Sequence, residues 1–292
     1  MSKRNLNTMD LDSISTLQIL KKINDEDKKI AYAVEKELEN IKDSVEIIVD
    51  ALKKNGRMFY IGSGTSGKLG VIDASECPPT FGVDDSMIQG IISGGEKAVS
   101  GWLEHTEDNE ELAVEDIKKR GVKKGDILVG ISASGNTPYV KSALEYGNKI
   151  GCKTIGIMCS DEGKIKRVSH ISICVDVGAE VIMGSTRMKA GTAQKMVLNM
   201  LSTTSMIKLG KTYSNLMVSV KPINKKLENR VKEIVQLATG EKLVIVDKIL
   251  KQCEYNPKIA IIMIKTGMSA EKAKEELSNC NGIVYEVLKS IQ

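Results

Sequence analysis

The segment from residue 58 to 82, MFYIGSGTSGKLGVIDASECPPTFG, restricts the fold more than any other part of this chain. Its first residues form an apolar run that predicts a buried strand closed by Gly62. A turn rich in glycine and hydroxyl residues follows, and a helical pattern begins near Ser66. Glycine lets the backbone approach an anion closely, and the start of a helix favours negative charge. We therefore predict an anion-binding turn made by Ser63, Thr65 and Ser66.

The same segment carries a candidate catalytic acid, Glu76. Pro78 and Pro79 lack an N–H and restrict the residue before them, so we expect them to end the helix. Glu76 would then lie at a helix end, where burial beside the prolines would favour the protonated carboxyl. Cys77 is a weaker candidate as a nucleophile, because no histidine accompanies it in the sequence and burial beside the prolines is the commoner explanation.

A second strand and hydroxyl turn follow downstream. Residues 126–131 predict another apolar strand, and the sequence SASGNTP leads from it into a helix through residue 149. Helix capping would explain a single turn of this kind. Two such turns beyond parallel strands would converge at one edge of the sheet, which favours a site for a small phosphorylated molecule. The residues predicted to bind in this second turn are Ser132, Ser134, Gly135, Asn136 and Thr137.

Two nucleotide-binding motifs fit the first turn less well. Gly62, Gly64 and Gly67 satisfy the dinucleotide pattern GxGxxG, but no acidic residue closes a second strand at the required distance. The P-loop pattern GxxxxGK is also present, although Leu69 replaces the serine or threonine that would bind magnesium. Both motifs therefore rank below a site for a small phosphorylated molecule.

Composition limits the class of protein. The 292 residues are 41% hydrophobic and 27% charged, as in a globular protein with a sizeable core. A net charge of +4 without a basic tract, and 3% aromatic residues, argue against a nucleic-acid partner. No signal peptide or membrane-spanning run is evident, so we expect a cytoplasmic protein. Six scattered cysteines predict reduced thiols, and two isolated histidines argue against a metal site.

The order of patterns predicts an α/β fold, a three-layer doubly wound parallel sheet of about five strands. We expect an N-terminal helical segment over residues 1–55, with Asn24 capping a long helix that runs to Lys54. The α/β domain would occupy residues 56–221, with Pro222 marking its exit. Residues 222–292 are predicted to be helical, and 255–292 resemble the three-helix fold of ubiquitin-associated-type domains.

The glycine-rich segment closely resembles the signature of N-acetylmuramic acid 6-phosphate etherases. The resemblance extends to SASGNTPY at 132–139, EVIMGSTRMKAGT at 180–192 and LQIL at 17–20, and it covers nearly the whole chain. The central region also resembles the wider sugar isomerase (SIS) fold. Lys68 stands where the family usually has arginine. The positive charge is kept, but the planar guanidinium group with its fixed N–H donors is lost.

The resemblance implies an enzyme that cleaves the lactyl ether at C3 of its substrate by elimination and hydration, without a cofactor. It assigns Glu76 as the proton donor and Glu107 as the base, and it implies a homodimer. Residue chemistry by itself does not separate Glu107 from the neighbouring acids Glu104, Asp108, Glu110, Glu111 and Glu115. Arg187 and Lys189 would either assist at the site or form surface salt bridges. A sugar-phosphate isomerase and a non-catalytic sugar-phosphate-binding regulator remain the alternatives.

Overall fold

The structure, a computed structural model, describes residues 3–101, 105–220 and 224–291. Contacts divide the chain into two compact units. The first unit contains the residues up to 75 and residues 85–202, and the second contains residues 76–84 and those from 203 onward. The predicted domain boundary at 55/56 stays a prediction. The boundary at 221/222 lies outside the described residues, as does Pro222.

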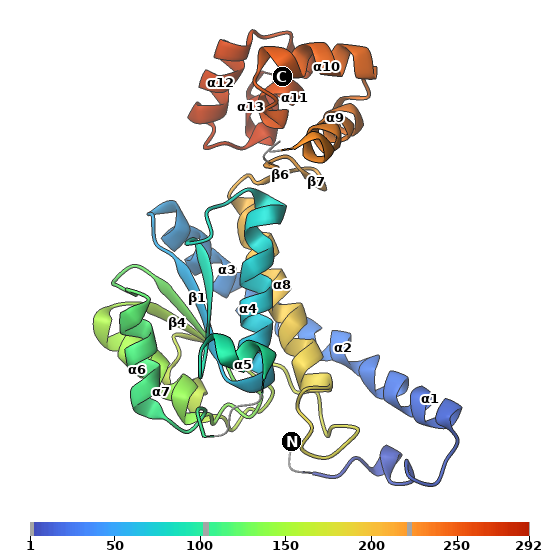
Figure 1. Ribbon diagram of the computed structural model, residues 1–292, viewed down its shortest axis with the longest axis vertical. Helices are drawn as coiled ribbons and strands as arrows, with labels where there is room; N and C mark the ends of the chain where they lie inside the picture. Colours follow the sequence, from blue (N-terminus) through green and yellow to red (C-terminus); the bar gives the residue numbers. More distant parts are fainter. Residues whose placement is uncertain (1–2, 102–104, 221–223, 292) are drawn as a thin grey trace. The chain divides into compact units, whose positions relative to one another are not determined.

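A parallel sheet forms the centre of the first unit (Figure 1). Its described strands are β1 (Met58–Gly62), β2 (Ile88–Ile92), β3 (Ile127–Ile131), β4 (Lys153–Met158) and β5 (Ile171–Cys174), in the order β2-β1-β3-β4-β5. In the register of the sheet, Gly62 pairs with Ile92 on one side and with Ile131 on the other. The loops after β1, β2 and β3 therefore leave the sheet side by side at its carboxyl edge.

Helices cover both faces of this sheet (Figure 1). Phe59 and Ile61 pack on one face against α6 (Glu110–Lys119) and α7 (Pro138–Ile150). Tyr60 points to the other face because side chains alternate along a strand. There a Cβ on Gly70 of α4 (Gly64–Phe81) would approach the Cβ of Tyr60 to 2.8 Å. With α3 (Leu38–Lys53) and α8 (Lys189–Lys208) on this second side, the predicted three-layer α/β fold is confirmed.

The N-terminal helical segment differs from the prediction. It contains the 3₁₀ turn η1 (Leu6–Thr8), α1 (Thr16–Asp27), α2 (Lys29–Glu35) and α3 in place of one long helix. Ser15 caps α1, and its N–H and hydroxyl both donate to the Gln18 side chain. This Ser-x-x-Gln capping box starts the helix eight residues before Asn24. The prediction that Asn24 is an N-cap was wrong, because its carbonyl accepts from Lys28 N–H inside α1.

The prediction that Pro78 and Pro79 end the helix was also wrong. Helix α4 runs through both prolines to Phe81, and Gly82 then leaves it with a φ of 62°. Proline fixes φ close to the helical value, so the main cost is the loss of two N–H donors and steric crowding. The buried side chains of Cys77 and Phe81, four residues apart, pack on the same helix face and offset that cost.

The second unit is mainly helical, as predicted. It contains α9 (Lys225–Thr239), α10 (Leu243–Gln252), α11 (Pro257–Thr266), α12 (Ala270–Asn279) and α13 (Val284–Ile291). Side chains of Asn224, Asn256 and Ser269 cap three of these helices. A short hairpin, β6 (Thr212–Tyr213) and β7 (Leu216–Met217), precedes them and was not expected from the sequence. The likeness of residues 255–292 to a ubiquitin-associated-type domain stays a prediction.

Candidate active site

A cavity of about 430 Å³ lies at the carboxyl edge of the sheet in the first unit. Both hydroxyl turns line it, together with the loop before α6. Of the residues predicted to bind, the cavity wall contains Ser63, Thr65, Ser66, Ser134, Asn136 and Thr137. Gly64, Ala133, Pro138, Asp108 and Thr186 complete the wall with Glu107. The volume falls in the range typical of small-molecule sites, roughly 300–1,000 Å³.

The first turn supplies buried hydroxyls and the start of α4. Ser63 Oγ is buried and has no hydrogen-bond partner in the described part of the chain. Ser66 is also buried, and its hydroxyl donates to Gln194 Oε1 at 2.9 Å. The first N–H groups of any α-helix have no partner within that helix. The beginning of α4 at Gly64 therefore adds donors where an anion would be held.

The second turn is held by hydrogen bonds within itself. Ser132 and Thr137 place their hydroxyl oxygens 2.7 Å apart, and Ser134 Oγ accepts from Asn136 N–H at 3.1 Å. Gly135 has a φ of 70°, and a Cβ there would lie 2.7 Å from Gly163 Cα, so glycine is required. Ser132 is buried behind the cavity wall and contributes through Thr137.

The position of Glu107 is fixed by its backbone. Its carbonyl accepts from Tyr139 N–H at 3.0 Å, and the hydroxyl of Thr106 lies 3.1 Å from that of Ser93. Asn109 then caps α6 by accepting from Leu112 N–H. Among the acidic residues that sequence chemistry did not separate, Glu107 and Asp108 line the cavity, whereas Glu110, Glu111 and Glu115 belong to α6 and do not. Glu104 lies outside the described residues.

Glu76 is not part of the cavity wall. It belongs to the second unit, whereas the residues of the cavity wall belong to the first. Its side chain is exposed, so the expected burial at a helix end beside Pro78 is wrong for this chain. The reason is that α4 continues past the prolines, which leaves Glu76 on a solvent-facing side of the helix. Its assignment as proton donor stays a prediction.

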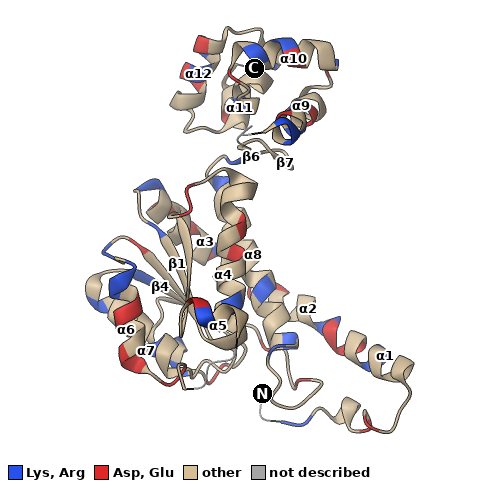
Figure 2. Ribbon diagram, viewed as in Figure 1, with Lys and Arg blue, Asp and Glu red and all other residues tan. Residues whose placement is uncertain are grey.

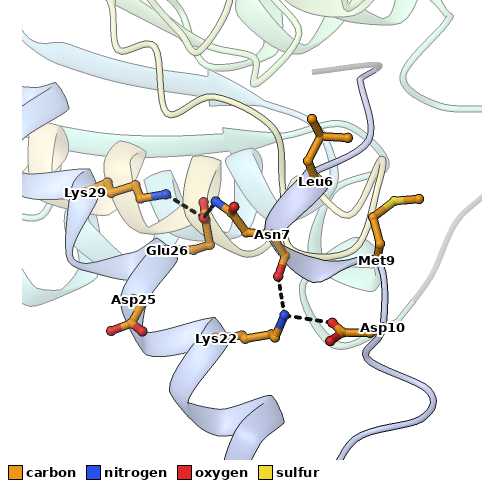
Figure 3. Close-up of a pocket in the computed structure, with 8 residues that line it drawn as sticks. All are labelled: Leu6, Asn7, Met9, Asp10, Lys22, Asp25, Glu26 and Lys29. Atoms are coloured by element: carbon orange, nitrogen blue, oxygen red, sulfur yellow. Dashed lines mark hydrogen bonds and ion pairs between the residues drawn. The ribbon is translucent and has the colours of Figure 1, made fainter.

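Lys189 has a structural partner. It is buried, and its Nζ donates to Glu26 Oε2 at 2.7 Å and to Val177 O at 2.8 Å, so the surface salt bridge considered for it is wrong. Burial raises the pKa of Glu26, but hydrogen bonds from Lys189, Lys29 and Asn7 outweigh burial and lower it to about 2. Figure 3 shows Glu26 between Asn7 and Lys29 in the wall of a separate cavity of about 610 Å³.

The residues that line that larger cavity include no serine or threonine. Hydrogen bonds and ion pairs already use its charged side chains, including Lys22 with Asp10 at 2.7 Å (Figure 3). Arg187 differs from Lys189, because it is exposed and has no ion pair within the described ranges. It follows Thr186, a residue of the smaller cavity that the sequence analysis did not select. The serine and threonine of the GSTR sequence were the available signal for Thr186.

Other chemical groups are arranged as follows. No group of three or more metal-ligating side chains gathers among the residues that the structure describes. Cys152, Cys159, Cys174, Cys253 and Cys280 are free thiols, and Cys77 is buried and does not line the cavity. Basic and acidic residues are both scattered over the helices of each unit (Figure 2). No described helix is long and apolar enough to cross a membrane.

Comparison with known proteins defines the class. The family described as "SIS domain" matches residues 102–204, and "Glucokinase regulatory protein N-terminal SIS domain" matches residues 40–148. Phosphoheptose isomerase GmhA from Neisseria gonorrhoeae has a TM-score of 0.50 at 17% identity, covering 65% of this chain and 98% of its own. The structure of the c3406 protein of E. coli CFT073 gives 0.50 at 18% identity, covering 69% and 97%. The fold is that of an SIS domain.

The particular family follows from closer relatives. The N-acetylmuramic acid 6-phosphate etherase of Clostridium botulinum (strain Okra / Type B1) is 52% identical over 99% of this chain and 95% of its own length. The etherase of Clostridioides difficile (strain 630) is 50% identical over the same shares. The chain therefore belongs to the N-acetylmuramic acid 6-phosphate etherase family.

Proposed function

We propose that this protein cleaves N-acetylmuramic acid 6-phosphate to N-acetylglucosamine 6-phosphate and D-lactate. The observation that carries the proposal is that both hydroxyl turns and Glu107 line one cavity of about 430 Å³. The names of the full-length relatives supply the substrate.

The phosphate would bind between the two turns. Ser63, whose buried hydroxyl lacks a partner in the described part of the chain, and Thr137 would donate to its oxygens, as would the first N–H groups of α4. Helix α7 begins at Pro138 on the other side of the cavity and adds a second favourable dipole. Binding energy from this remote phosphate would position the reacting carbons, which lowers the entropic part of the barrier.

Glu107 would act as the base. In the open-chain sugar the C2–H bond lies next to the aldehyde, so its electron pair can pass into an enolate when the carboxylate takes the proton. The enolate then expels the C3 oxygen, which leaves as D-lactate after it receives a proton from an acid. Water adds at C3, and a proton returns to C2. These steps leave the oxidation level of the sugar unchanged and need no redox partner.

Glu76 would supply the acid from the second copy of a homodimer. This proposal is supported by the exposure of its side chain and by its absence from the cavity wall. Mixed dimers of Glu76→Gln and Glu107→Gln then contain one intact site, so mixing the two inactive variants should restore part of the turnover. Failure to restore any turnover in mixed dimers would argue that both groups act from one chain.

The test of the function is a D-lactate assay on N-acetylmuramic acid 6-phosphate. We expect release by the wild type and its loss in Glu107→Gln, with substrate binding kept. Asp108→Asn is the matched control, because Asp108 lines the same wall and is expected to leave most turnover. Conversion of another sugar phosphate to its isomer without lactate release would instead make the protein an isomerase. Binding with no turnover of either kind would make it a regulator.

We also place the reaction in the cytoplasm. The substrate and the amino-sugar product both carry a phosphate, and the high cost of moving a charge into hydrocarbon keeps them in the compartment where they form.

A further inference from the structure

One face of α8 lies against the beginning of α4. A Cβ on Gly191 would be 3.5 Å from Thr65 Cγ2, an ordinary van der Waals distance, so the two helices lie close together there. Gln194 is three residues further along α8 and shares that face. Its Oε1 accepts the hydrogen of the Ser66 hydroxyl at 2.9 Å. Gln194 thus contacts a residue of the cavity wall from behind, and only 1% of it is exposed.

The amide of Gln194 is incompletely paired. Its Nε2 is buried and has no hydrogen-bond partner in the described part of the chain. Buried side-chain donors are usually paired, and an unpaired one costs about 1–3 kcal/mol. The amide carries two N–H donors on one side and an acceptor on the other. In this orientation the acceptor is used by Ser66, and the donors are not used.

The orientation of the amide determines what Ser66 can offer to a ligand. A hydroxyl has one hydrogen, and here Ser66 gives it to Gln194, so its lone pairs remain for the cavity. A phosphate dianion presents only acceptors and needs that hydrogen. If the amide turns by half a turn about its last bond, Nε2 donates to Ser66 Oγ and releases the hydroxyl hydrogen. The same rotation pairs Nε2 but breaks the bond to Oε1, so the hydrogen bond that Ser66 then gives to the phosphate is what favours the turned amide.

We propose that Gln194 is a positioning residue for phosphate: its amide turns over when phosphate binds, so that Ser66 donates to the ligand. The proposal deepens the proposed function and rests on it, because it assumes that the cavity holds a sugar phosphate. Gln194 itself touches neither the phosphate nor the reacting carbons.

Two substitutions separate the two orientations. In Gln194→Glu the ionised carboxylate only accepts, so it holds the Ser66 hydrogen permanently. We expect the dissociation constant of N-acetylglucosamine 6-phosphate to rise about 10- to 100-fold, the effect of one hydrogen bond to a charged group. In Gln194→Met the side chain cannot form such a bond, Ser66 rotates freely, and we expect a smaller rise, about 3-fold.

The experiment is titration calorimetry with N-acetylglucosamine 6-phosphate and with inorganic phosphate, which requires no turnover. Ser205→Ala is the matched control, because it removes a buried hydroxyl, unpaired in the described part of the chain, from the same helix and should leave both affinities unchanged. In a Ser66→Ala background, Gln194→Met should have no further effect on either affinity. A purely structural role would give the same loss in both backgrounds.

The outcomes distinguish this inference from the proposed function. If the wild type binds both ligands and Gln194→Met behaves the same with or without Ser66, the positioning role is overturned while the function stands. Equal affinities of Gln194→Met and wild type, with Gln194→Glu unchanged as well, would overturn it too. If the wild type binds neither ligand, the sugar-phosphate site itself is wrong. Gln194→Met keeps the test decisive should the buried carboxylate of Gln194→Glu prevent folding.

Discussion

The hydroxyl oxygens of Ser132 and Thr137 lie 2.7 Å apart, so one donates to the other across the turn that follows β3. Ser132 is buried and Thr137 faces the cavity, which makes the pair a link between the core and the binding surface. A network of this kind fixes the orientation of the exposed hydroxyl before a ligand arrives, so less ordering is needed on binding.

Thr137→Val should weaken phosphate binding without disturbing the fold. Valine keeps the shape of threonine but removes the hydroxyl that would donate to the ligand and leaves Ser132 without this partner. We expect kcat/KM for the muramic acid phosphate to fall about 10- to 100-fold, mostly through KM. Steady-state kinetics give this value. Ser172→Ala, a change of a half-buried serine on β5, is the control, and an equal loss there would contradict the role of Thr137.

Glu26→Gln should lower the melting temperature in a pH-dependent way. The pKa of Glu26 is about 2 in the folded protein and ordinarily 4.5, so its stabilising effect is fully present above pH 4.5. It is lost as the pH falls through about 2. Thermal scans should therefore show a constant difference in melting temperature between variant and wild type from about pH 8 to 5. This difference should become smaller below about pH 4.5.

The control for this comparison is Glu39→Gln. Glu39 pairs with Lys42 on the exposed surface of α3, where such pairs contribute roughly 0–1 kcal/mol. The melting temperature of the Glu39→Gln variant should stay close to that of the wild type. A difference in melting temperature between Glu26→Gln and the wild type that grows on acidification would contradict the depressed pKa of Glu26.

Pro79→Ala should stabilise the protein. Pro79 lies inside α4, where proline is about 3 kcal/mol less favourable than alanine. This value is the upper limit of the increase in the free energy of unfolding. Denaturant unfolding measures the change. Pro257→Ala is the matched control, because Pro257 lies in the first turn of α11, where proline is tolerated and its replacement gains nothing. No gain at position 79 would mean that the helix ends before the prolines.

Two core cysteines should resist alkylation in the native protein. Burial is the main cause that raises the pKa of Cys152 to about 11 and that of Cys159 to about 12, which leaves little thiolate near neutral pH. Mass spectrometry after brief treatment with iodoacetamide near neutral pH should show both unlabelled, while partly exposed Cys280 is modified. Labelling of Cys159 as fast as Cys280 would show that its surroundings open readily.

Strands β1 and β3 were predictable because they are short and apolar and are followed by turns rich in glycine and hydroxyl residues. Gly62 and Ser132 mark two of these strand ends, and parallel pairing brings their loops together as expected. The helix boundaries were harder to predict. Proline signals a helix end by local energetics, and the local rule failed at Pro78 because packing of Cys77 and Phe81 outweighs it.

The cavity wall was predictable only in part. Hydroxyl residues of the two turns are indicated by their type and position, whereas Gln194 reaches Ser66 from 128 residues away, and no local pattern predicts that contact. The acidic cluster shows the same limit. Its residues are chemically alike, and only the position of the loop before α6 separates Glu107 and Asp108 from the acids of α6.

The most direct test of the account is the reaction of N-acetylmuramic acid 6-phosphate in deuterium oxide, with both products analysed by mass spectrometry. Elimination and hydration predict D-lactate together with N-acetylglucosamine 6-phosphate that carries one solvent deuterium at C2, and neither product from Glu107→Gln. Lactate released with no deuterium at C2 would indicate direct displacement and contradict the role of Glu107 as the base. The absence of lactate would contradict the proposed function itself.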